Sequence, residues 1–209
     1  MRQDVTDYVK GCADCQRNKV NNQARKATLN PIFAKTGALP FETVSMDFSI
    51  KLPVSNGFDS VLTVTDHNCT KAIILIPCNK SITAEGVAKL CLEHIFKRVG
   101  LPQTFIHDRD TRFMSSFAVK MCQALGIRQN TSTAFHLRTD GQSERTNQKL
   151  EQFLQFYSNT CQDNWAQFLS LAEFTFNSWR NKSTKKSPFE LFMGYNPRAE
   201  WTVISSPVP

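Results

Sequence analysis

The stretch FETVSMDFSI, residues 41–50, alternates apolar and polar side chains and holds one residue that strands rarely contain. A period of two places the apolar residues at the even positions on one face of a strand, and Ser45, Asp47 and Ser49 on the other. Aspartate is disfavoured in strands and its charge is costly to bury. We therefore expect Asp47 either to face solvent or to lie beside something positive.

The bulk composition is that of an ordinary globular chain. With 209 residues, 41% hydrophobic and 21% charged, it suits one medium domain with a small appendage. No run approaches the length of apolar sequence that spans a membrane, and the N-terminus is not a signal peptide. Seven cysteines, an odd number, favour reduced thiols over a disulfide framework. The net charge of +7 is compatible with a polyanionic partner.

The order of expected elements favours a mixed α/β layer fold. Three strands come first and are joined by turns, one of them at Asn56-Gly57, and helices then alternate with two more strands. Strands are expected at 44–50, 60–65, 72–77, 103–107 and 127–132, and helices at 83–98, 116–125, 139–160 and 164–179, with one short helix in the following tail.

Three carboxylates stand out by position. Asp47 lies within a strand, Asp108 directly follows the 103–107 strand, and Glu144 lies in the first turn of the long helix. Each has an ordinary interpretation: a solvated strand residue, the start of a turn, and a favourable charge at a helix N-terminus. If they converge, they repel one another unless a divalent cation such as Mg²⁺ neutralises them.

Three strings that follow SMDF (45–48) carry a family resemblance. HDRDTRF (107–113), STAFHLRTDGQSERTNQ (132–148) and SPFELFMGYNPR (187–198) closely resemble the integrase of Ty3/gypsy-type retrotransposons. That family belongs to the retroviral integrase superfamily. The resemblance implies an α/β fold, a ribonuclease H-like core with a mixed five-stranded sheet flanked by helices.

The resemblance also implies a catalytic triad. The superfamily signature is two aspartates followed, after 35 intervening residues, by a glutamate, and 35 residues separate Asp108 from Glu144. Choosing Asp110 would leave only 33. By resemblance, Asp47 bridges two Mg²⁺ or Mn²⁺ ions, Asp108 binds one of them and Glu144 the other.

The first 40 residues resemble part of a zinc module. Cys12 and Cys15 form a C-x-x-C pair that matches the second half of a His₂Cys₂ site, and no histidine precedes His67. We expect residues 1–40 to be a truncated zinc-module remnant plus linker that holds no stable zinc. The catalytic core is expected at 41–200 and a tail at 201–209.

Basic and amide residues within or beside the motifs are the expected DNA contacts. They are Arg109, Arg112, Arg138, Gln142, Arg145 and Lys149. A second basic run, RNKSTKK (180–186), is interpreted as a solvated loop.

The implied function is DNA integration. A metal-dependent polynucleotidyl transferase would process the 3′ ends of retroelement DNA and join them to target DNA, as a homo-oligomer assembled on DNA in the nucleus, with no membrane partner. Two alternatives stay open at this point. One is a catalytically inactive truncated core that only binds nucleic acid, and the other is a ribonuclease H-type nuclease with the same fold.

Overall fold

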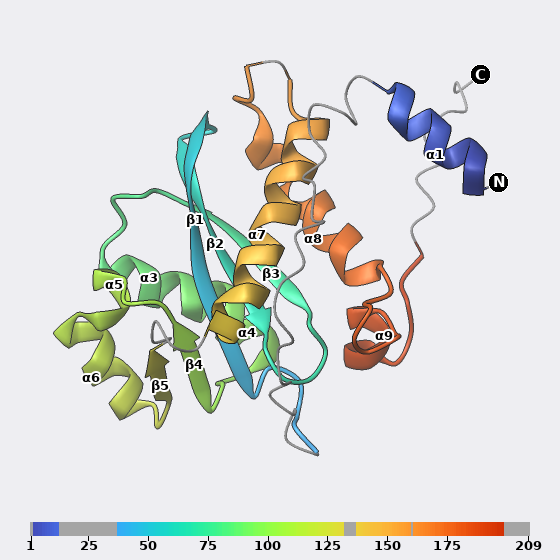
Figure 1. Cartoon of the computed structure of the whole chain (residues 1–209). Helices are drawn as coiled ribbons and strands as arrows, with labels where there is room; N and C mark the ends of the chain where they lie inside the picture. Colours follow the sequence, from blue (N-terminus) through green and yellow to red (C-terminus); the bar gives the residue numbers. More distant parts are fainter. Residues whose placement is uncertain (1, 13–36, 132–136, 160, 199–209) are drawn as a thin grey trace, which may run out of the picture.

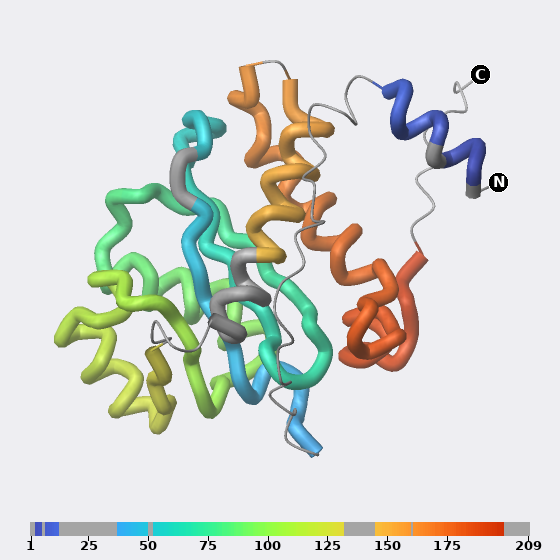
Figure 2. The backbone as a smooth tube through the Cα atoms, in the orientation of Figure 1, coloured from blue at the N-terminus to red at the C-terminus, as the bar shows by residue number. Residues whose placement is uncertain are grey.

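The computed structural model describes residues 2–12, 37–131, 137–159 and 161–198, with the side chains at positions 2, 6, 50, 51 and 137–144 outside that description (Figure 2). Its centre is a five-stranded mixed sheet in the order β3-β2-β1-β4-β5. The strands are β1 (Thr43–Ser55), β2 (Phe58–Asp66), β3 (Ile73–Cys78), β4 (Thr104–His107) and β5 (Arg128–Thr131). The strand number and the mixed pairing agree with the fold expected from the sequence.

Helices cover both faces of the sheet (Figure 1). One face is covered by α3 (Ala84–Leu90), the π-helix η1 (Cys91–Phe96), α4 (Lys97–Val99), α5 (Thr111–Met114) and α6 (Ser116–Ala124). The other face is covered by α7 (Leu137–Tyr157), the 3₁₀ helix η2 (Trp165–Phe168) and α8 (Leu169–Ser178). The remaining described helices are α1 (Arg2–Gly11) and α9 (Pro188–Met193). None of the described helices is both long and apolar enough to cross a membrane.

The alternation of β1 distributes its residues between two hydrophobic clusters. Val44, Met46 and Phe48 enter the cluster under α3, η1 and α6. The polar residues of β1 face the opposite side, where α7 contacts the strand. The second cluster on that side is built around Leu150 and Leu154 of α7 and Trp165. The polar face of β1 is therefore covered by a helix.

Strand pairing fixes where the two aspartates lie. β1 runs parallel to β4, with Val44 opposite Phe105 and Met46 opposite His107. Continuing this register by one residue brings positions 47 and 108 side by side. Because neighbouring strands lie about 4.8 Å apart, the backbone at these two positions is close although 60 residues separate them.

The edge strand β3 is closed by side chains of α8. Asn177 accepts a hydrogen bond from the Ile73 amide (2.9 Å) and donates one to the Ile73 carbonyl (2.8 Å). Glu173, one helical turn earlier, accepts a hydrogen bond from the Leu75 amide (2.8 Å). Four residues of helix rise about 6 Å, and two residues of strand span nearly the same length. Residues 173 and 177 of α8 can therefore contact residues 75 and 73 of β3 in step.

The structure differs from the sequence expectations at several element boundaries. The helix expected at 83–98 is present, but its middle widens to the π-helix η1. The strand expected at 44–50 extends to Ser55, since Trp165 donates a hydrogen bond to the Pro53 carbonyl (2.6 Å) and holds that end in place. The helix α1 was not expected, because the N-terminal segment is predominantly polar and offers few apolar residues to a core.

Candidate active site

Asp47 lies partly buried on β1 with both carboxylate oxygens hydrogen-bonded. Oδ1 accepts from the Phe48 amide (2.9 Å), and Oδ2 accepts from Nδ2 of Asn147 on α7 (2.8 Å). The second bond joins residues 100 positions apart and fixes α7 against the middle of β1. Asp47 is therefore not a solvated strand residue. In these two bonds its carboxylate accepts from amide groups, one of them on a helix, and not from a cation.

Asp108 follows β4 directly and is exposed. Its Oδ1 accepts a hydrogen bond from the Asp110 amide (3.1 Å), which closes a short turn. Its own carbonyl lies 2.7 Å from Nδ1 of His107. A carbonyl can only accept, so Nδ1 carries the proton. The His107 ring is 2% exposed and packs on Phe113 with centroids 4.9 Å apart, which anchors the backbone that presents Asp108.

Residue 144 lies in the N-terminal half of α7, three positions before Asn147. Residues three apart in a helix lie on the same face. Since Asn147 contacts Asp47, the helix face that carries position 144 is turned toward the same part of the sheet. The Glu144 side chain itself lies outside the described residues.

Sequence reasoning missed Asn147. Its amide nitrogen holds Asp47, while its Oδ1 is buried without a hydrogen-bond partner among the described residues. The available signal was its position one helical turn after Glu144 and three residues before Leu150, on the face of α7 that carries the apolar stripe. That position alone does not reveal the contact, because the contact depends on how α7 packs on β1.

The donor set fits a hard divalent cation. Two carboxylates at neighbouring register positions provide oxygen ligands of the kind Mg²⁺ prefers, and Asp108 is open to solvent. Among the side chains that the structure describes, no three His, Cys, Asp or Glu residues group closely enough to bind a metal. The residues that would hold Mg²⁺ or Mn²⁺ are Asp47 and Asp108 together with Glu144.

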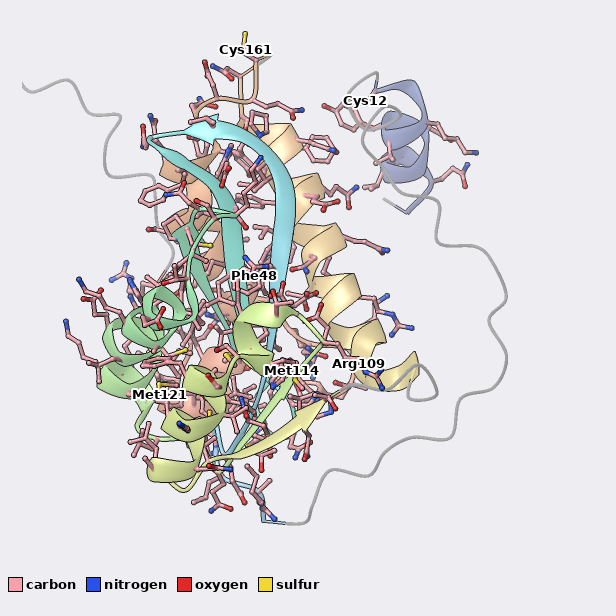
Figure 3. All side chains as sticks on the ribbon, turned by 90° about the vertical axis from the view of Figure 1, so that its left-hand side faces the viewer. Cys12, Phe48, Arg109, Met114, Met121 and Cys161 are labelled. Atoms are coloured by element: carbon pink, nitrogen blue, oxygen red, sulfur yellow. The ribbon has the colours of Figure 1, made fainter. Side chains whose placement is uncertain are left out.

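The expected DNA contacts divide into two kinds. Arg109 is exposed on the loop after β4 (Figure 3), and Arg145 and Lys149 are exposed one turn apart on α7. These three are available to phosphate. Arg138 and Gln142 lie in the first turns of α7, with side chains outside the described set.

Arg112 is placed differently from the other basic residues. Its guanidinium pairs with both carboxylate oxygens of Asp110, and its Cζ lies 3.5 Å from the centre of the Phe48 ring. The side chain is only 12% exposed. Hydrogen bonds from Arg112 hold the pKa of Asp110 below its usual value. Most hydrogen-bond donors of Arg112 are therefore used within the protein. Its expected role in DNA binding stays a prediction.

The cysteine pair of the expected zinc remnant is only half described. Cys12 lies half-buried directly after α1, and its amide donates to the Tyr8 carbonyl (3.0 Å). Cys15 lies outside the described residues, as does the rest of 13–36.

Comparison with known proteins identifies transposon relatives. The chain is 34% identical over 197 residues to the transposon Tf2-3 and Tf2-4 polyproteins of Schizosaccharomyces pombe, a match that covers 94% of this chain. The chain spans about 15% of the length of these curated relatives. No protein-family model matches the sequence.

Solved structures with the same fold are integrases. The catalytic core domain of BIV integrase covers 74% of this chain, with a TM-score of 0.56 and 20% identity, and 95% of that chain is matched. The HTLV-2 integrase catalytic core domain, in complex with magnesium, has a TM-score of 0.58 and 18% identity over 75% of this chain and 99% of its own. The simian T-cell lymphotropic virus intasome in complex with a PP2A regulatory subunit matches 100% of this chain and 70% of its own, with a TM-score of 0.64 and 19% identity.

The mixed sheet and the helices on both of its faces are the ribonuclease H-like fold of these integrase catalytic cores. Together with the transposon polyproteins, these neighbours confirm the resemblance to retrotransposon integrases that the sequence motifs indicate.

Proposed function

We propose that this chain carries the catalytic core of a retrotransposon integrase, a polynucleotidyl transferase that processes the 3′ ends of element DNA and joins them to target DNA. The observation that carries the proposal is the convergence of β1, β4 and α7. It is supported by the β1–β4 register, which pairs Met46 with His107 directly before the two aspartates, and by the bond from Asn147 to Asp47 on the helix that also holds Glu144.

Two groups of residues have different roles in the proposed site: some would hold the metal ions and others orient these ligands. Asp47, Asp108 and Glu144 would hold two Mg²⁺ or Mn²⁺ ions, which when bound supply activation of an attacking oxygen and stabilisation of a leaving one in phosphoryl transfer. Asn147 fixes one oxygen of Asp47, which orients the carboxylate. His107 and the Asp110 amide fix the backbone and the side chain of Asp108. Preorganised ligands of this kind need little rearrangement before reaction.

DNA would lie across the exposed cations beside these carboxylates. Arg109, Arg145 and Lys149 supply the positive charge, and the bonds they form to phosphate position DNA without reading its sequence. Joining two DNA ends in one reaction calls for more than one copy of the core, and the HTLV-2 core has been solved in dimeric and trimeric forms. We propose that this chain also acts as a homo-oligomer on DNA, and that it does so in the nucleus.

A disintegration assay tests the proposal, because it asks an integrase core to reverse strand transfer on one branched DNA. Wild type is compared with Glu144→Gln, with Mg²⁺, Mn²⁺ or EDTA. The matched control is Glu151→Gln, an exposed carboxylate two turns further along α7. Metal-dependent resolution that is lost in Glu144→Gln and kept in the control supports the proposal.

Two results would count against it. A folded wild type that binds the branched DNA but never resolves it favours the inactive nucleic-acid-binding core. Faster cleavage of the RNA strand in an RNA–DNA hybrid than joining of DNA ends favours the ribonuclease H-type nuclease.

A further inference from the structure

The loop between α8 and α9 presents cations and aromatic rings on one surface. Trp179 is 61% exposed at the end of α8, and Tyr195 is 63% exposed just after α9. Four exposed basic residues lie in the loop between them. We call this the basic-aromatic surface, made of Trp179, Arg180, Lys182, Lys185, Lys186 and Tyr195.

The loop is a built structure with its own internal bonds. The Asn181 amide donates to the Lys186 carbonyl, and the Lys185 amide donates back to the Asn181 carbonyl, both at 2.9 Å. The Asn181 side chain accepts from the amide and the hydroxyl of Ser183, both at 2.9 Å. The Nε of Arg180 donates to the Lys185 carbonyl. These bonds hold the four cations on a defined turn.

Asn196 joins the two aromatic residues of this surface. Its amide nitrogen donates to the Ser178 carbonyl (3.2 Å), and its Oδ1 accepts from the Ser187 hydroxyl (3.2 Å). Trp179 directly follows Ser178 and Tyr195 directly precedes Asn196, so the bond places the backbones of the two aromatic residues side by side. Trp179 also packs edge-on against Phe176, with centroids 5.9 Å apart.

The positive charge on this surface is not neutralised by direct ion pairs within the described residues. No carboxylate there forms an ion pair with Arg180, Lys182, Lys185 or Lys186. The nearby Glu190 side chain accepts from the Ser187 amide (2.7 Å) in a capping box at the start of α9. Hydrogen bonds from Ser187 lower the pKa of Glu190, with smaller contributions from Lys186 and Arg180. Cations beside exposed rings match the chemistry of a polyanion that carries unpaired bases.

We propose that the basic-aromatic surface binds an unpaired DNA strand, with phosphates on the loop cations and bases stacked on Trp179 and Tyr195. Duplex DNA would offer phosphates there but no free base faces. The choice of DNA over RNA rests on the proposed function. The surface is separate from the candidate active site, since α8 covers the β3 edge and α9 packs beyond it, whereas Asp108 follows β4 (Figure 1).

Fluorescence anisotropy with labelled oligo(dT) tests this proposal in the full chain. We expect Trp179→Ala to weaken oligo(dT) binding about fivefold or more, because stacking on one base is lost. We expect Lys182→Ala/Lys186→Ala to reduce the slope of log affinity against log salt by about 1.4, because each phosphate contact to a single strand contributes about 0.7.

Matched controls keep the result specific. Tyr8→Ala removes an exposed ring on α1, and Lys89→Ala removes an exposed cation on α3. Both should leave oligo(dT) binding unchanged. Asp47→Asn should keep this binding while abolishing disintegration, so failure here and failure of the proposed function are distinguishable.

Three outcomes overturn the proposal. One is equal loss of oligo(dT) and duplex binding in Trp179→Ala, since it shows that stacking is not involved. Another is tighter binding of oligo(rU) than oligo(dT), which assigns the surface to RNA. The third is unchanged oligo(dT) binding in folded Trp179→Ala and in folded Lys182→Ala/Lys186→Ala. This result would indicate that the surface binds a different partner, such as an acidic peptide.

Discussion

At the scale of single residues, Asp47 depends on a partner that is distant in sequence. The sequence motifs single out Asp47, Asp108 and Glu144 as candidate metal ligands, because the resemblance to integrases implies two aspartates and a glutamate at these intervals. The bond from Asn147 spans 100 positions and arises only when α7 packs on β1. No local pattern encodes such a contact, which is why sequence reasoning missed it.

Replacing Asn147 should therefore weaken catalysis more than folding. We expect Asn147→Ala to lower the disintegration rate about 10- to 100-fold and to raise the Mg²⁺ concentration needed, as is typical when the partner of a metal ligand is lost. Gln148→Ala, the next position on the helix, is the control. A thermal midpoint that drops in parallel with activity, with an unchanged Mg²⁺ requirement, would reduce Asn147 to a packing residue.

Arg112 should matter for stability rather than for DNA. Its contacts with Asp110 and the Phe48 ring are mostly shielded from water, and we expect Arg112→Ala to lower the free energy of unfolding by about 1–3 kcal/mol. Urea unfolding measures this. An unchanged urea midpoint together with weaker binding of duplex DNA would show instead that Arg112 contacts phosphate.

The same pair makes a pH-dependent contribution. The folded pKa of Asp110 is lowered, chiefly by hydrogen bonds from Arg112, so the pair stabilises the fold above the unfolded pKa of about 3.9 and loses this effect as pH falls through the folded pKa. Thermal melts from about pH 6 down to about pH 2.5 should show a steeper loss in wild type than in Asp110→Asn. Parallel curves would contradict this expectation.

At the scale of elements, α8 takes the place of a missing neighbour strand. Asn177 pairs both main-chain groups of Ile73, and Glu173 accepts from the Leu75 amide. Uncovered strand edges promote pairing between molecules, and this edge is covered. The alternation and turns of the sequence predict the strands and most helices, but they do not predict which helix side chains close an edge, nor the π-helix within 91–96.

Removing the side-chain amide of Asn177 should leave the β3 edge without its hydrogen-bond partner and destabilise the fold. Asn177→Leu leaves the buried amide and carbonyl of Ile73 without their partner, and we expect a loss of about 2–4 kcal/mol in unfolding free energy and earlier aggregation on heating. Ser178→Ala, whose hydroxyl bonds only the Phe174 carbonyl within α8 among the described residues, is the control. Urea unfolding and light scattering measure the two effects.

Glu173 should give the opposite pH dependence to Asp110. Burial raises its pKa, against the bonds from the Leu75 amide and Arg98. A raised folded pKa means that its contribution is full below the unfolded value of about 4.3 and declines as pH rises through the folded pKa. Relative to Glu173→Gln, which can still accept from the Leu75 amide, wild type should lose stability as pH rises from about 4 to about 7.

At the scale of the whole molecule, two hydrophobic clusters hold the sheet, and the backbones of β1, β4 and α7 come together near Asp47. Because these clusters are built without metal ligands, we expect the chain to fold in the absence of metal. The fold class follows from composition and element order, because a layered α/β core is what such an order can bury. The docking of α7 across the sheet follows only from three-dimensional packing.

Binding of Mg²⁺ should therefore stabilise a chain that is already folded. We expect the thermal midpoint of wild type to rise with added Mg²⁺ through preferential binding to the folded state, and that of Asp47→Asn or Asp108→Asn to stay constant. Scanning fluorimetry with and without EDTA measures this. An equal rise in both variants would indicate nonspecific ion effects.

The pairing of β1 with β4 gives this site an unusual sensitivity to alignment. Deleting a single residue from 104–107 would keep all three proposed metal ligands, yet Asp108 would shift by half a period and face the opposite surface of the sheet. The geometry of the proposed site depends on the alignment of the neighbouring strands β1 and β4, so we expect an insertion or deletion there to abolish disintegration more completely than most substitutions around it.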